Sequence, residues 1–275
     1  MSSYKLPLIV LRGAGDLATG VALRLYRAGL TKILLLEKDN PLAVRRTVAF
    51  SEAFYVKIAT VENVQAVHVQ NINDLDVIWK KNQIPLLIDP NAQCLRNLQV
   101  DILIDAILAK KNLGTNKNMA KLVIALGPGF TAGKDKNTDV HAIVETMRGH
   151  YLSRVIYEGQ AIPNTGCPAP VQGFSTERVF WAEEDGIFNT HHQIGNLVKK
   201  DDELGRVNKQ IFFAKFDGII RGLLRDQTPV TKRTKLGDID PRCDIDYCHE
   251  ASDKALAIGG GVLEIIMQYL LKQKM

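Results

Sequence analysis

Cysteine is scarce in this chain, which has only Cys94, Cys167, Cys243 and Cys248 among its 275 residues. Four widely spaced cysteines do not match a disulfide-stabilised scaffold, so we expect reduced thiols. Cys243, Cys248 and His249 form one short cluster, but no second ligand pair at zinc-site spacing accompanies it. We therefore predict no metal site. Cys167 lies in the turn-rich stretch NTGCPAPVQGF, where a thiol could be exposed and reactive, but no neighbouring base is apparent, so we interpret it as an ordinary loop cysteine.

Long hydrophobic runs are also lacking. No window of the chain approaches the ~18 consecutive apolar residues that a membrane-spanning helix needs. The N-terminal stretch MSSYKLPLIVLR lacks the order of basic, apolar and small residues that marks a secretory signal. We therefore expect a cytoplasmic protein that does not bind membranes.

The chain also lacks a strong excess of charge of one sign. The chain carries 35 basic and 30 acidic residues, interleaved along its length, and its net charge is +5. This balance permits an anionic ligand. No basic tract interleaved with aromatic residues is present, so we expect no nucleic-acid partner.

Residues 6–37, LPLIVLRGAGDLATGVALRLYRAGLTKILLLE, organise the rest of the chain. A continuous apolar run ends at the turn Gly-Ala-Gly, and apolar residues then recur at helical spacing. Gly29 closes this helix, and a second apolar run ends on Glu37. The pattern predicts a strand, a tight turn, a helix and a second strand.

The glycines of this turn have separable roles. Gly13 allows the backbone to turn, Gly15 allows a phosphate to approach bare amides, and Ala18 is the small third residue of a dinucleotide-binding pattern. Glu37 follows at about the 20-residue distance expected for a carboxylate that binds a ribose hydroxyl. The alternative is that the glycines only permit close packing of helix and strand. The predicted cofactor-binding residues here are Gly13, Ala14, Gly15, Asp16, Leu17 and Glu37.

Asp16 argues against a standard arrangement, because its carboxylate would repel a pyrophosphate placed on the same amides. We therefore expect a nucleotide or dinucleotide, either NAD or molybdopterin dinucleotide, that binds differently from NAD in other proteins. Arg45 and Arg46, in a short helix predicted within residues 41–50, are further candidates for phosphate contacts, unless they form a solvated basic face. Gly127 and Gly129 flank Pro128 in a second glycine-rich strand exit that could present amides to an anion.

The remaining pattern predicts three regions. Short β-rich pieces near residues 55–58 and 66–69, with apolar strands near 85–88, 101–107 and 122–126, indicate an α/β fold, a Rossmann-like domain with a mostly parallel sheet, over residues 1–150. Residues 151–245 lose helical periodicity and should form a small all-β domain. Residues 246–275 should form a C-terminal helix that packs back on the first domain.

An internal repeat lies within the β-rich region. Residues 180–207 and 212–239 align without a gap and share a turn of sequence Asp-Gly and a later Leu-Gly pair. Two such halves can bury one core together, as in the barrel-sandwich hybrid of biotinyl and lipoyl domains. Lys209 lies between the halves, but no carrier signature surrounds it. We therefore predict a structural or docking module.

The C-terminal helix should begin at Ser252 as its N-cap. Its three consecutive glycines each cost ~1 kcal/mol relative to alanine, so a neighbouring helix or a phosphate should approach them closely. These residues are Gly259, Gly260 and Gly261.

Several motifs together resemble one known family: GAGDLATG, PLAVRRTVAFSEA, LGPGFTAGKD, ETMRGH, GDIDPR and SDKALAIGGGVLE. The chain is similar to YqeB-type accessory proteins of the selenium-dependent molybdenum hydroxylase system, and the resemblance suggests kinship with the Rossmann domain of xanthine dehydrogenase accessory factors. The chain departs from the pattern at TGCPAP and around residues 134–138. The resemblance transfers no catalytic residue. It points to Arg148, His150, Lys254 and the three tail glycines as residues that either support the ligand-binding residues or contact a partner.

The resemblance implies a protein that matures molybdenum hydroxylases, handling the dinucleotide form of the molybdenum cofactor or its sulfur or selenium ligand. A hydroxylase or its cofactor-insertion machinery is then the expected partner, and a homo-oligomer stays open. One alternative is an NAD-dependent oxidoreductase, with His150 or Lys110 facing the nicotinamide. Another is a non-catalytic scaffold whose glycine turn is empty.

Overall fold

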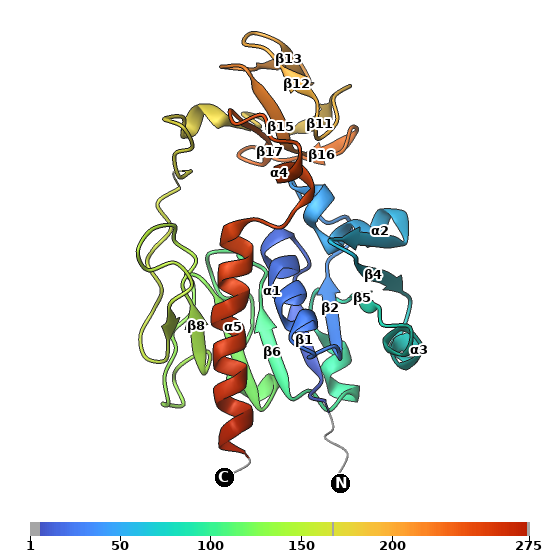
Figure 1. The fold of residues 1–275 in the computed structure, drawn as a ribbon, viewed down its shortest axis with the longest axis vertical. Coiled ribbons are helices and arrows are strands. Elements are labelled where there is room, and N and C mark those ends of the chain that lie inside the picture. Colours follow the sequence, from blue (N-terminus) through green and yellow to red (C-terminus); the bar gives the residue numbers. More distant parts are fainter. Residues whose placement is uncertain (1–5, 167, 274–275) are drawn as a thin grey trace. The chain divides into compact units, whose positions relative to one another are not determined.

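The computed structural model describes residues 6–166 and 168–273, so Cys167 lies outside the described residues. The chain forms two compact units (Figure 1). The first unit comprises Met1–Pro41, Ala49–Asn164 and Ala251–Met275, and the second comprises Leu42–Val48 and Thr165–Glu250.

A nine-stranded sheet forms the centre of the first unit, in the order β3-β4-β5-β2-β1-β6-β7-β8-β9. The strands from β4 to β8 in this order are parallel, and the edge strands β3 and β9 pair antiparallel. The strands are β1 (Ile9–Arg12), β2 (Ile33–Glu37), β3 (Ile58–Val61), β4 (Val64–Val69), β5 (Ile84–Ile88), β6 (Ile102–Asp105), β7 (Leu122–Leu126), β8 (Ala142–Val144) and β9 (Val155–Ile156).

The order of the strands reverses at β1. Strands β2, β5 and β4 extend the sheet on one side of β1, and β6, β7 and β8 extend it on the other. Connections therefore leave the carboxyl ends of β1 and its neighbours in opposite directions, which opens a crevice at that edge.

Successive side chains of the central strands point to opposite faces of the sheet, and both faces are buried. Helices α1 (Asp16–Arg27) and α5 (Asp253–Lys272) pack together on one face (Figure 1). The other face buries Val10, Leu34 and Leu103 together with Leu75 of α3 (Leu75–Lys80) and nearby 3-10 turns.

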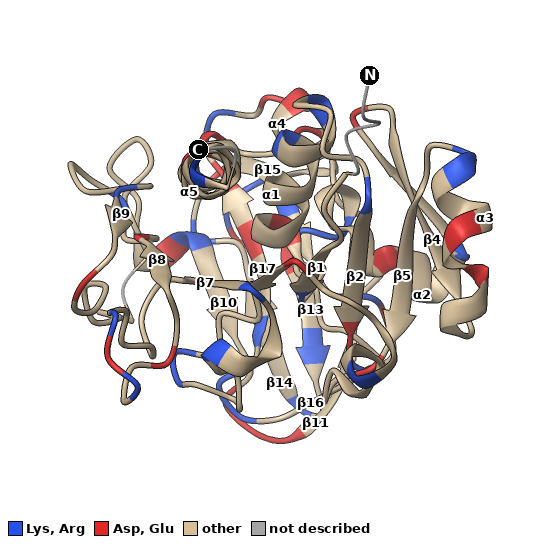
Figure 2. Ribbon diagram, turned by 90° about the horizontal axis from the view of Figure 1, so that it is seen from below, with Lys and Arg blue, Asp and Glu red and all other residues tan. Residues whose placement is uncertain are grey.

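Charged residues of both signs are spread along the ribbon (Figure 2). Segments coloured for lysine or arginine and for aspartate or glutamate occur on helices, loops and strands, and neither sign is confined to one part of the chain. This distribution agrees with the interleaved charges of the sequence.

Glycines set the close approach of α1 and α5. A Cβ atom at Gly20 would lie 2.5 Å from the Cβ atom of Ala255, and one at Gly259 would lie 2.9 Å from the carbonyl oxygen of Gly20. A Cβ atom at Gly261 would meet the carbonyl oxygen of Ser153 at 2.5 Å, whereas Gly260 faces open space. Neighbouring protein segments therefore account for Gly259 and Gly261, with no phosphate required.

Helix α5 is the one helix among the described residues that is long and apolar enough to cross a membrane. Its side chains Ile258, Val262 and Ile266 are buried, and the helix packs against α1 and against β7 and β8. A buried helix of a globular core meets the same criteria of length and composition. Ser252 caps its N-terminus by accepting a hydrogen bond from the Ala255 amide, as the sequence predicts.

The second unit contains two four-stranded antiparallel sheets, in the orders β10-β17-β15-β12 and β14-β13-β11-β16. The first repeat supplies β10 to β13 and the second supplies β14 to β17, so each sheet takes two strands from each repeat. The strands are β10 (Val179–Trp181), β11 (Gly186–Asn189), β12 (Leu197–Val198), β13 (Glu203–Val207), β14 (Gln210–Phe213), β15 (Gly218–Leu223), β16 (Thr228–Val230) and β17 (Lys235–Asp240).

The shared Asp-Gly turns join the two repeats reciprocally. The Asp185 carboxylate accepts a hydrogen bond from the Lys232 amide at 2.7 Å, and the Asp217 carboxylate accepts one from the Lys200 amide at 2.8 Å. Each aspartate thus fixes a turn in the other repeat. The two halves therefore depend on each other for both their sheets and their turns.

The boundaries of the two units differ from those of the expected domains. Strand β9 pairs with β8, so the chain up to Asn164 stays with the first unit rather than leaving it at residue 150. Helix α4 (Asp246–His249) belongs to the second unit, and the first unit resumes at Ala251.

Residues 41–50, which the sequence predicts to contain a short helix, do not form an α-helix. In place of a helix they contain the 3-10 turn η1 (Arg46–Val48) and the first residue of η2 (Phe50–Glu52), and Leu42–Val48 belongs to the second unit. Its backbone is held there by strand β15, because the Leu223 amide donates to the Val44 carbonyl at 2.7 Å. The short helix in this part of the chain is α2 (Ala53–Val56), where the sequence suggested a β-rich piece.

Candidate functional site

A cavity of about 510 Å³ opens at the carboxyl edge of the parallel strands in the first unit. It lies at the ends of β1, β2, β5 and β6, on both sides of the point where the strand order reverses. Ligands of open α/β sheets bind at this position. The cavity is lined by Arg12, Gly13, Leu36, Glu37, Lys38, Asp89, Pro90, Asn91, Ile107 and Leu113.

The two glycines of the first turn are constrained differently. Gly13 has φ +105°, and a Cβ atom there would lie 2.8 Å from the carbonyl oxygen of Ala106. Both the backbone and the neighbouring loop therefore require glycine at this position. Gly15 has φ −68° and ψ −176°, and, among the described residues other than its two chain neighbours, no atom lies within 4 Å of the position of its missing Cβ. Among the described residues, nothing fills the space in front of Gly15.

Side-chain carboxylates already accept hydrogen bonds from some of the backbone amides that the sequence predicts to bind a phosphate. The Ala14 amide donates to Glu37 Oε2 at 2.9 Å, and the Leu17 amide donates to Asp16 Oδ1 at 2.9 Å. For the amides of Gly15 and Asp16, no acceptor is found in the described part of the chain. These two amides lie at the N-terminus of α1, where the helix dipole favours an anion.

Glu37 lies between the glycine turn and the cavity. Its second carboxylate oxygen, Oε1, accepts from the Lys38 amide at 2.9 Å. Burial raises the pKa of Glu37, and the hydrogen bonds from Lys38 and Ala14 oppose that rise. Each carboxylate oxygen can accept more than one hydrogen bond, so Glu37 retains capacity for a hydroxyl in the cavity.

Arg12, which lines the cavity, forms a buried ion pair with Asp105. Arg12 and Asp105 are only 4% and 1% exposed, and Arg12 NH1 lies 3.7 Å from Asp105 Oδ2. The Thr115 hydroxyl bridges them, accepting from Arg12 NH1 and donating to Asp105, each at 2.5 Å. Arg12 also donates to the Pro90 carbonyl at 3.1 Å. This network fixes the loops that follow β5 and β6.

Sequence reasoning did not find this ion pair. Arg12 and Asp105 end adjacent strands and are partners in the register of β1 and β6. The available signal is a charged residue at the end of each of two apolar strands. The pairing itself depends on which strands are neighbours, which only the sheet order reveals. Burial raises the pKa of Asp105, and the Thr115 hydrogen bond and the Arg12 charge oppose this effect.

Basic side chains gather around the N-termini of α1 and α5. Burial lowers the pKa of Lys254, as do the charges of Arg148 and Lys110, whereas Asp16 and Glu145 oppose this shift. Partial burial also lowers the pKa of Lys110. Arg148 itself is held by Asp253 through two hydrogen bonds of 2.9 Å. The charges of Lys254 and Asp16 therefore act on each other favourably.

The second glycine-rich turn is occupied by protein contacts. The Gly127 amide donates to the Val144 carbonyl at 2.9 Å, and its Cβ position is blocked by Thr146. A Cβ atom at Gly129 would lie 2.7 Å from the backbone of Lys111. These glycines allow the loops after β6, β7 and β8 to pack together.

Of the predicted cofactor-binding residues, the cavity lining contains Gly13 and Glu37. It does not contain Ala14, Gly15, Asp16, Leu17, Arg45, Arg46, Gly127 or Gly129, nor the candidates for supporting or partner contacts, such as His150. The His150 ring packs against the Tyr151 ring, with 5.2 Å between centroids. Arg45 and Arg46 belong to the second unit, where Arg45 donates to the Tyr247 carbonyl and Arg46 to the Leu223 carbonyl. Over residues 6–166 and 168–273, no group of three or more metal-ligating side chains occurs.

Comparison with known proteins finds a relative of this chain. No family model matches the chain. Over 263 residues, 96% of its length, the chain is 45% identical to "Uncharacterized protein YqeB" of Escherichia coli strain K12. The chain is thus similar to this YqeB protein over nearly all of its own length. The chain spans 48%, about half, of the length of that YqeB protein.

Two solved structures show weak similarity to this chain. The product-bound ectoine utilization protein EutE (DoeB) from Ruegeria pomeroyi has a TM-score of 0.26 and 14% identity. The succinylglutamate desuccinylase/aspartoacylase from Rhodobacter sphaeroides has a TM-score of 0.25 and 13% identity. Each comparison covers 85% of both chains.

Proposed function

We propose that the first unit is a Rossmann-like domain that binds a nucleotide or dinucleotide, NAD or molybdopterin dinucleotide. The nucleoside occupies the 510 Å³ cavity, and its phosphates lie against the turn at Gly15. The observation that carries this proposal is the unfilled space in front of Gly15, next to a cavity at the carboxyl ends of parallel strands.

The side chains around the cavity have complementary roles in this proposal. Glu37 accepts a hydrogen bond from a ribose hydroxyl, and the amides of Gly15 and Asp16 donate to a phosphate. Lys254 offsets the charge of Asp16, so that carboxylate does not prevent an anion from binding. Because a carboxylate at Glu37 repels a 2′-phosphate, NAD should bind more tightly than NADP.

The wider role that we propose is in the maturation of molybdenum hydroxylases, including selenium-dependent ones. It is supported by the motifs that resemble the accessory proteins of that system. The partner is then a hydroxylase or its cofactor-insertion machinery in the cytoplasm. The second unit, whose sheets each combine strands of both repeats, serves as a structural module similar to a barrel-sandwich hybrid.

Calorimetric titration with NAD, NADP, CTP and molybdopterin dinucleotide tests the nucleotide site. At least one ligand should bind, and Gly15→Val should weaken it at least tenfold, because the new side chain fills the space in front of the turn. Gly260→Ala, in open space on α5, is the matched control and should bind normally.

Other outcomes separate the alternatives. Binding of none of the four ligands would contradict the proposal and leave a scaffold. Dinucleotide binding with a substrate-dependent change in nicotinamide absorbance would instead support an NAD-dependent oxidoreductase. Circular dichroism of Gly15→Val establishes that a loss of binding is not a loss of fold.

A further inference from the structure

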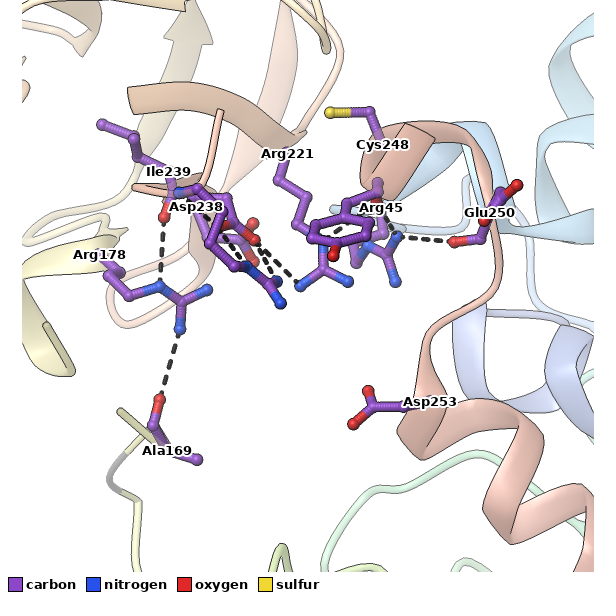
Figure 3. Close-up of polar contacts among 12 residues, drawn as sticks. Arg45, Ala169, Arg178, Arg221, Asp238, Ile239, Cys248, Glu250 and Asp253 are labelled. Atoms are coloured by element: carbon purple, nitrogen blue, oxygen red, sulfur yellow. Dashed lines mark hydrogen bonds and ion pairs between the residues drawn. The ribbon is translucent and has the colours of Figure 1, made fainter. Parts of the chain in front are cut away.

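Several arginines of the second unit gather around β17 and are held there by protein groups (Figure 3). Arg178 donates to the carbonyl oxygens of Ile239 at 3.2 Å and Ala169 at 3.4 Å. Arg242 binds the Asp240 carboxylate through hydrogen bonds of 2.9 and 2.6 Å. These contacts account for the arginines as structural residues. The first unit contains a different group of basic residues, which lines a second pocket.

This lysine pocket has a volume of about 720 Å³ and lies at the edge of the sheet opposite the nucleotide cavity. Lys117, in the 3-10 turn η5 (Lys117–Met119), precedes β7, and His141 directly precedes β8, so the pocket adjoins the amino ends of these two parallel strands. The loop after β7, the residues after β9 and the last turns of α5 complete its lining. Its volume is within the range of about 300–1,000 Å³ that is typical of small-molecule sites.

His141 provides a hydrogen-bond donor in the lysine pocket. Its Nδ1 atom accepts a hydrogen bond from the Val123 amide at 2.9 Å, so the neutral ring carries its hydrogen on Nε2. Burial lowers the pKa of His141, and the charge of Lys117 lowers it further, which favours this neutral form. Among the described residues, no acceptor binds the Nε2 hydrogen, and Nε2 is not sealed in the interior. The backbone of β7 thus fixes a ring whose second nitrogen is available to a ligand.

Lys117 adds a positive charge that is not paired with a carboxylate. Its partly buried ammonium group donates to the carbonyl oxygens of Gly133 and Asp135 and to the Thr138 hydroxyl. All three acceptors are neutral, and within the described ranges Lys117 forms no ion pair. Neutral dipoles orient an ammonium group but do not cancel its charge. The charge of Lys117 is therefore held in place at the pocket, where it attracts an anion.

Two further lysines line the pocket from separate segments. Lys134 belongs to the loop after β7, and Lys272 is the last residue of α5. For the residues that the structure describes, neither lysine has an ion-pair partner. Lys272 also stabilises the negative end of the α5 dipole, so Lys134 is the more specific indication of an anionic ligand. The only carboxylate in the described lining is that of Glu158.

Tyr157 contributes a second hydroxyl-type donor and an aromatic surface. Burial raises its pKa, and the charge of Glu264 on α5 raises it further, so the hydroxyl stays protonated and can donate. The charges of Glu158 and Glu264 oppose those of the lysines, but the three lysines outnumber these two glutamates. The pocket therefore combines an excess of positive charge, hydrogen-bond donors and an aromatic ring.

We propose that the lysine pocket binds a small organic anion through a carboxylate or phosphate group. The anionic group accepts the Nε2 hydrogen of His141 and lies near the ammonium groups of Lys117 and Lys134, and the rest of the molecule packs against the Tyr157 ring. This site is independent of the nucleotide site, because the two lie at opposite edges of the sheet.

Calorimetric titration of the whole protein with citrate and, separately, with glycerol 3-phosphate tests this site at constant ionic strength set with chloride. At least one anion should bind, and the comparison distinguishes a carboxylate from a phosphate ligand. His141→Asn should weaken binding at least tenfold, because asparagine can still accept from the Val123 amide but lacks the Nε2 hydrogen. Lys134→Gln, at an exposed loop position, should weaken binding at least threefold and serves as the second variant should His141→Asn fail to fold.

Lys80→Gln is the matched control, because it removes the same charge from an exposed position at the end of α3 and should change affinity less than twofold. The proposal is overturned if neither anion binds, or if the control weakens binding as much as Lys134→Gln. It is also overturned if Gly15→Val abolishes anion binding while His141→Asn and Lys134→Gln preserve it, because the anion would then occupy the nucleotide site. Anion binding retained in Gly15→Val, and lost in His141→Asn, supports two separate sites.

Discussion

Gly13 and Gly15 lie in one turn but are glycine for different reasons. Gly13 is required by its positive φ and by the close approach of the loop after β6. Gly15 has an ordinary backbone conformation and open space around it, so the fold itself does not demand glycine there. A small residue that the fold does not require is informative, because its smallness leaves room for a ligand.

Glu37 gives a prediction of pH dependence. Because burial raises its pKa in the folded chain, its contribution to stability is fully present below the ordinary glutamate range and is lost as pH rises through the raised pKa. In urea unfolding at a series of pH values from about 4 to about 7, Glu37→Gln should therefore lose less stability with rising pH than the unmodified protein.

Glu264→Gln, at an exposed position of α5, is the control for this series. The stability of this variant should change with pH in the same way as that of the unmodified protein. Identical pH profiles for Glu37→Gln and the unmodified protein would show that burial of the Glu37 carboxylate does not contribute to this dependence.

At the scale of elements, contact between α1 and α5 depends on small residues on both helices. Gly20 and Gly259 permit a backbone-to-backbone approach, and the apolar face of α5 then covers the sheet. Two of the three tail glycines thus act in packing against protein, which was one of the two explanations that the sequence left open.

Adjacent glycines of α5 provide a matched test of this packing. Gly259→Ala places a methyl group 2.9 Å from the Gly20 carbonyl oxygen and should lower the free energy of unfolding by about 1–3 kcal/mol. Gly260→Ala meets no atom and should raise it by up to ~1 kcal/mol through helix propensity. Chemical denaturation measures both, and equal effects would contradict the packing explanation.

At the scale of the whole molecule, the chain leaves the first unit twice to build a second unit of different construction. The first unit is built around a mostly parallel sheet, and the second around two sheets that each combine strands of both repeats. The reciprocal hydrogen bonds of Asp185 and Asp217 make the second unit dependent on both repeats.

This dependence predicts that Asp185→Ala and Asp217→Ala have similar effects. Each removes the carboxylate acceptor of one turn amide in the opposite repeat, which should destabilise the second unit by about 0.5–1.5 kcal/mol. Hydrogen exchange measured by mass spectrometry should show faster exchange across both repeats of the second unit. Faster exchange confined to the mutated repeat would contradict the reciprocal arrangement.

The sequence alone determined the strand-turn-helix-strand opening, the Ser252 cap and the internal repeat. These features follow from short-range periodicity, from turn chemistry and from the alignment of one half with the other. They are visible without knowing which distant segments meet.

Only the tertiary structure decided that Leu42–Val48 joins the second unit, that Arg12 meets Asp105, and that the arginines gather around β17. Each result depends on residues far apart in the chain. Their proximity follows from strand order and packing, which local sequence patterns do not encode.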